Sequence, residues 1–157
     1  MESTNDDIEI LIETLEQTSI LFASIAARFE DEELRRRPSP DEWSPRELLA
    51  HLHACAEVWG KDIDRMLAQD APSYRNVHAR KVMLLDRHVT PTFEEATRAF
   101  ATLRTTFLET IRSLRPDQWE RSAVIDRRPS TVYLHVKRMA SHEVVHRAQI
   151  EAAVNSV

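Results

Sequence analysis

Length, composition and charge exclude several classes of protein. The 157 residues fit a single domain, residues 1–157, and 42% hydrophobic with 30% charged residues is typical of a soluble globular chain. A single glycine argues against the glycine-rich loops that bind phosphates or dinucleotides. A net charge of −5 without a basic stripe argues against a nucleic-acid partner.

The chain shows no targeting segment. No run of about 20 apolar residues is long enough to span a membrane, and the acidic first residues are unlike a signal peptide. One cysteine, Cys55, cannot form a disulfide framework within the chain. We therefore expect a cytoplasmic protein without a membrane partner.

Four amphipathic segments are predicted to form helices. The first covers residues 6–29, and the second covers residues 45–68 after a capping box made by Ser44 and Glu47. The third follows a second capping box, Thr92 to Glu95, and ends near residue 114 before a proline. Ser130 is predicted to cap the fourth, which runs to about residue 154.

The connections between these segments indicate how the helices are arranged. Residues 69–91 form a long connection of weak periodicity, which would let the second and third helices run parallel. Residues 115–129 are expected to be a loop, and a short strand at 122–125 is left open. Four amphipathic helices predict an all-α fold, a four-helix bundle with a long crossover.

Histidines on two of the predicted helices suggest a metal site. His142 and His146 are four residues apart, so they lie one above the other on one helix face. His51 and His53 on the second helix project from opposite flanks of its apolar face, and periodicity favours His51 only weakly. His135 lies about 10 Å before His142 along the helix, so we interpret it as a supporting or core histidine. A metal-free polar cluster is the alternative to a metal site.

The same residues spell the His-Glu-x-x-His pattern of metalloproteases, in which Glu143 would be the general base. Such enzymes usually need a third ligand downstream. Only 11 residues follow His146, and Glu151 is the only carboxylate among them. A protease is therefore disfavoured.

Two segments together resemble a known family. They are residues 43–52, WSPRELLAHL, and residues 142–150, HEVVHRAQI. Their order and separation are similar to those of the DinB-like superfamily, bacterial four-helix bundles of up-down-down-up topology, many of them described as metal-dependent hydrolases.

The resemblance implies a site and two kinds of activity. The family's metal ligands fall on His51, His142 and His146, which selects His51 over His53, and Gln149 matches the family pattern beside the last histidine. Members with assigned activity include transferases and isomerases that use low-molecular-weight thiols. A homodimer and a small-molecule substrate, such as a low-molecular-weight thiol, are also expected.

Three neutral histidines leave a coordination position open, as catalytic sites do. The expected cofactor is a divalent transition metal such as zinc, nickel, iron or manganese, and the ligand set does not select one. The metal would activate either a water for hydrolysis or a thiol for transfer. No catalytic side chain is assigned. Glu143 is a candidate for orienting a ligand ring, but we favour an ion pair with Arg147 four residues later.

Two hypotheses from different classes follow. The first is a metal-dependent enzyme, a hydrolase or a thiol transferase. The second is a non-catalytic bundle, stress-related or interacting, with a structural or vacant metal site. The open ligand position favours the enzyme, whereas the lack of a clear acid or base near the histidines opposes it. Cys55 lies one turn from His51 and is interpreted as a core residue rather than a ligand.

Overall fold

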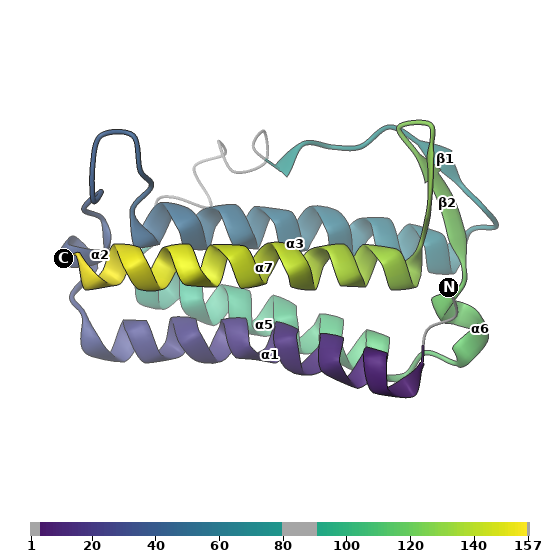
Figure 1. The fold of residues 1–157 in the computed structure, drawn as a ribbon, viewed down its shortest axis with the longest axis horizontal. Helices are drawn as coiled ribbons and strands as arrows, with labels where there is room; N and C mark the ends of the chain where they lie inside the picture. Colours follow the sequence, from purple (N-terminus) through teal and green to yellow (C-terminus); the bar gives the residue numbers. More distant parts are fainter. Residues whose placement is uncertain (1–3, 80–90, 157) are drawn as a thin grey trace.

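Four long helices lie side by side in the computed structural model, which describes residues 4–79 and 91–156 (Figure 1). They are α1 (Asn5–Arg28), α3 (Pro45–Ala68), α5 (Phe93–Arg112) and α7 (Val132–Asn155). Following the colours from purple to yellow, α1 and α7 run in one direction, and α3 and α5 run in the other. The predicted four-helix bundle, up-down-down-up with parallel second and third helices, is confirmed. Part of the crossover, residues 80–90, lies outside the described residues.

The helices begin where side chains satisfy their first backbone N–H groups. The oxygens of Thr4, Ser44 and Thr92 each accept a hydrogen bond from the N–H three residues later, which confirms the two predicted capping boxes. The prediction that Ser130 caps the last helix is wrong. Ser130 lies in a strand, and Thr131 caps α7 instead. The extended strand before α7 includes Ser130, so the helix begins one residue later than the sequence predicted.

The segment that leads into α7 is not simply a loop. It contains the short helix α6 (Pro116–Trp119) and the hairpin of β2 (Ser122–Ile125) and β3 (Arg128–Thr131). The open strand at 122–125 is therefore β2. Asp126 and Arg127 make the turn with φ of 50° and 67°, the left-handed conformation that two-residue hairpins require. The strand β1 (Ser73–Tyr74) pairs parallel to β2, so this small sheet ties the start of the crossover to the end of the bundle.

The core fills the space between the four helices in two clusters of buried apolar side chains. At one end, Phe22 packs edge-on against Phe93 at 6.1 Å and Phe100 at 5.2 Å between ring centroids. At the other end, Trp119 and residues of α3, α5 and α7 form the second cluster. Burial of these apolar faces orients the helices.

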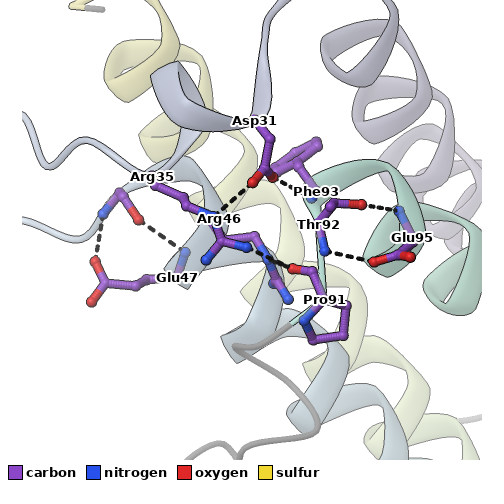
Figure 2. Close-up of polar contacts among 9 residues, drawn as sticks. Asp31, Arg35, Arg46, Glu47, Pro91, Thr92, Phe93 and Glu95 are labelled. Atoms are coloured by element: carbon purple, nitrogen blue, oxygen red, sulfur yellow. Dashed lines mark hydrogen bonds and ion pairs between the residues drawn. The ribbon is translucent and has the colours of Figure 1, made fainter.

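A polar cluster fixes the point where the crossover returns to the bundle (Figure 2). The buried guanidinium of Arg46 and that of Arg35 both donate to the Pro91 carbonyl, at 2.9 and 3.0 Å. Asp31, at the start of the short helix α2 (Asp31–Leu34), accepts from the Phe93 N–H at 2.6 Å and pairs with Arg35. The start of α5 is thus attached to α2 and α3.

One helix, α1, is long and apolar enough to pass a simple test for a membrane span, with a mean hydropathy of 1.3 in its best window. Its Leu15, Phe22 and Ile25 lie in the bundle core. Length and composition alone are weak evidence, because core helices of globular proteins pass the same test.

Candidate metal site

The structure brings His51 of α3 together with His142 and His146 of α7. Their ring centroids lie 4.3 to 5.1 Å apart, and one donor atom from each ring lies within 4.8 Å of the others. The Nε2 atoms of His51 and His142 are 3.2 Å apart. These are the three residues that the resemblance selected from the sequence, and that they bind a metal stays a prediction.

Two tryptophans hold the histidine rings in place. The Trp43 ring lies 5.0 Å from the His51 ring, and the Trp59 ring lies 4.9 Å from the His142 ring, both measured between centroids. Trp43 precedes the cap of α3, and Trp59 is buried two turns after His51 on the same helix. Figure 1 shows α3 and α7 as antiparallel neighbours. Rings from one helix therefore pack against rings from the other.

Burial and neighbouring imidazoles keep His142 uncharged. Burial, together with smaller contributions from His146, His51 and Arg138 in that order, lowers the pKa of His142 to about 4. His142 is therefore neutral at pH 7, the form that binds metals. The Nδ1 of His146 lies 2.9 Å from the side-chain oxygen of Gln149, which can only accept. This bond places the proton of His146 on Nδ1 and leaves Nε2 as the donor to a metal.

The residues present fit a divalent transition metal. Two nitrogens bound tetrahedrally to zinc lie about 3.3 Å apart, given zinc–nitrogen bonds of about 2.0–2.1 Å. The 3.2 Å between the Nε2 atoms of His51 and His142 agrees with that spacing. Without a metal, two neutral imidazoles at this distance share one hydrogen bond. The Nδ1 of His142 is buried and has no hydrogen-bond partner among the described residues, so Nε2 is its only engaged nitrogen.

An open cavity of about 750 Å³ lies beside the histidines. Its lining includes the crossover segment 76–79 and seven residues of α3 and α7, namely His51, Cys55, Trp59, Arg138, Ser141, His142 and Val145. Two of the three histidines therefore face a space large enough for a small molecule. The sequence did not indicate that Arg138 or segment 76–79 would line it, because the partners are far apart along the chain.

Comparison with known proteins identifies the family. Residues 14–150 match the model of the DinB superfamily. The chain belongs to the DinB superfamily. Among solved structures it is similar to YfiT from Bacillus subtilis, described as "a probable metal-dependent hydrolase with an unusual four-helix bundle topology". The two share 17% sequence identity and a TM-score of 0.84, over 98% of this chain and 89% of that one, which shows a common fold. No curated protein sequence matches.

Glu143 of this DinB chain lies on a different side of α7 from the histidines. Its carboxylate is 2% exposed and accepts from Arg104 of α5 at 3.0 Å, with a second bond between the same two groups, and from the Thr18 hydroxyl at 2.6 Å. The predicted ion pair with Arg147 is therefore wrong. Arg104 was missed, although a charged residue four positions after Phe100 on a buried stripe was a signal.

Cys55 is buried, with its sulfur 3.7 Å from Nε2 of His51. Burial raises the pKa of its thiol to about 12, and the charge of Glu143 adds to the shift. A protonated thiol is a poor ligand, and Cys55 is outside the group of converging donor atoms. Its surroundings favour the interpretation as a core residue.

The other two histidines of α3 and α7, His53 and His135, have partners outside the candidate metal site. The Nε2 of His135 lies 3.2 Å from a carboxylate oxygen of buried Asp62, so it is a core histidine with an acidic partner. His53 lies 3.4 Å from Glu57, and its ring packs 6.1 Å from that of Phe100. His53 thus faces α5, and only His51 of the two faces α7.

Proposed function

We propose that this DinB protein is a metal-dependent enzyme that acts on a small molecule at His51, His142 and His146. The observation that carries the proposal is the convergence of three imidazoles, from two helices, at the edge of an open cavity. A structural site would be closed by a fourth protein ligand, and no carboxylate joins the group among the described residues. When bound, a divalent transition metal would supply Lewis acidity that activates a water or a low-molecular-weight thiol.

The chain's own residues have distinct tasks in this proposal. Gln149 accepts the Nδ1 proton of His146 and so fixes its ring orientation and tautomer. Trp43 and Trp59 keep the His51 and His142 rings in position and exclude water from one side of them. The cavity beside the rings receives the substrate.

One observation favours a second function, a bundle whose metal site is structural or vacant. No aspartate or glutamate lines the cavity among the residues described, so no carboxylate acid or base stands beside the histidines there, although the lining includes the further imidazole of His78. Glu143, the only acidic candidate from the sequence, is held by Arg104 instead. In the enzyme, proton transfer would then rest with the substrate, the activated water or thiol, or solvent.

Elemental analysis of untagged protein tests the site. We expect about one equivalent of a transition metal in the wild type, and its loss in His142→Ala. The matched control is His53→Ala, which removes a histidine of α3 that faces α5 and should keep the metal. No metal in the wild type after incubation with zinc, nickel, iron and manganese salts would refute the three-histidine site.

A second measurement separates the enzyme from the non-catalytic bundle. Exchange of a metal-bound water with added thiols or anions would support the enzyme. A protein that holds no exchangeable ligand, and that is equally stable with and without metal, would support the other function. The homodimer and the cytoplasmic location stay predictions, and sedimentation at several concentrations would test the first.

A further inference from the structure

The charge of the cavity beside the histidines differs from that of the whole chain. The chain has 26 acidic and 21 basic residues. The described residues that line the cavity include one arginine, Arg138, and no aspartate or glutamate. A negatively charged molecule therefore meets no fixed negative charge on this lining, and it meets one fixed positive charge.

Arg138 is well placed to hold such a molecule. It lies one turn before His142 on α7, about 6 Å along the helix axis. Its guanidinium carbon lies 5.3 Å from the Trp59 ring centroid, and Trp59 also packs against His142. Stacking on the indole orients the guanidinium plane without using its N–H donors.

No acidic group among the described residues engages the donors of Arg138. Within residues 4–79 and 91–156 it forms no ion pair, whereas Arg104 and Arg121 pair with carboxylates. Among the described residues that line the cavity, Arg138 is thus the one fixed cation beside the histidines.

We propose that Arg138 binds an oxyanion, such as a carboxylate, of a small molecule whose reacting end lies at the three histidines. The inference rests on the proposed function and names its substrate class, an anionic molecule with its charge one helical turn from the reacting atom. The planar guanidinium forms two parallel hydrogen bonds to such a group, which sets the orientation of the ligand as well as its affinity.

The test uses probes that bind at both ends. The full chain is loaded with Co²⁺, and the cobalt–thiolate absorption band reports the binding of 3-mercaptopropionate or its uncharged amide, 3-mercaptopropionamide. A third probe, 2-mercaptoethanesulfonate, presents a tetrahedral anion instead of a planar one. These probes are read in the wild type, in Arg138→Gln, and in Lys137→Gln. The last removes the same charge from the neighbouring position, which acts on Asp7 of α1 rather than on the site.

We expect the wild type and Lys137→Gln to bind one or both anionic probes about fivefold more tightly than the amide, a size typical of a partly exposed ion pair. Arg138→Gln should lose that preference and bind the amide unchanged. The probe with the larger preference distinguishes a carboxylate substrate from one with a tetrahedral anion. A preference that persists in Arg138→Gln, or that is absent from the wild type, would overturn the role of Arg138 alone. If no cobalt band appears with any probe, the thiol-activating form of the proposed function fails as well, and elemental analysis separately tests whether the metal site exists.

Discussion

The buried pair of Glu143 and Arg104 makes a prediction that separates structural from catalytic roles. We consider the substitution Glu143→Gln, which keeps the size of the side chain and removes its charge. In the wild type both side chains are 2% exposed. Arg104 also donates to the Leu15 carbonyl at 3.1 Å, so the pair connects α7, α5 and α1.

The expected loss of stability follows from burial. The substitution leaves the guanidinium of Arg104 buried without a compensating charge, which costs about 3–5 kcal/mol. For a chain of this length, each kcal/mol lowers the melting temperature by about 2–4 °C, so we expect a decrease of about 10 °C. Replacing both partners by apolar residues, Glu143→Leu with Arg104→Met, removes the unpaired charge and should recover most of the loss.

Thermal and guanidinium unfolding at pH 7 measure this loss, and elemental analysis measures metal content. The matched control is Glu151→Gln, an exposed carboxylate two turns later on α7, which should change stability by less than about 0.5 kcal/mol. The folded Glu143→Gln protein should retain its metal, because glutamine keeps the size and position of the side chain that orients α7, and Glu143 bonds to Arg104 and Thr18 rather than to a histidine. Wild-type stability combined with lost activity would refute this reasoning and restore Glu143 as a catalytic residue.

Two further predictions concern the histidines. Gln149→Leu removes the acceptor of the His146 Nδ1 proton and should weaken metal binding by about 10–100-fold, measured by competition with a chelator; wild-type affinity would contradict the role given to Gln149. In the metal-free protein, the pKa of His142 is lowered from 6.5 to about 4, so the unfolded chain takes up a proton first as the pH falls. Above pH 6.5 the titration of His142 does not change the free energy of unfolding, and between pH 6.5 and 4 it lowers that free energy as the pH falls. Urea unfolding across that range should show a weaker pH dependence in His142→Gln, and equal slopes would show that His142 does not titrate in this way.

Local chemistry made the long helices predictable from the sequence. The boxes of Ser44 with Glu47 and Thr92 with Glu95 form within four residues, so their signal does not depend on the rest of the fold. The end of the hairpin was less predictable. Both Ser130 and Thr131 are able to cap a helix, and the pairing of β2 with β3 decides between them.

Contacts between distant segments decided the rest of the site. Periodicity favoured His51 over His53 only weakly, whereas the structure shows that the His51 ring faces α7 and the His53 ring faces α5. The pairing of Glu143 was predicted wrongly because a local partner, Arg147, stands four residues away. The real partner is 39 residues distant along the chain. Helical periodicity indicates which residues of the same helix are close to each other. It contains no information about which buried cation another helix supplies.

The position of Glu143 also explains how the bundle orients its histidines. Glu143 follows His142 directly, so the two side chains leave α7 about 100° apart. One of them is bound to Arg104 and Thr18, between α5 and α1, and the other points toward α3. Turning α7 about its axis to move His142 away from His51 would break a buried ion pair. The same interaction that stabilises the fold therefore fixes the direction of the candidate metal ligands.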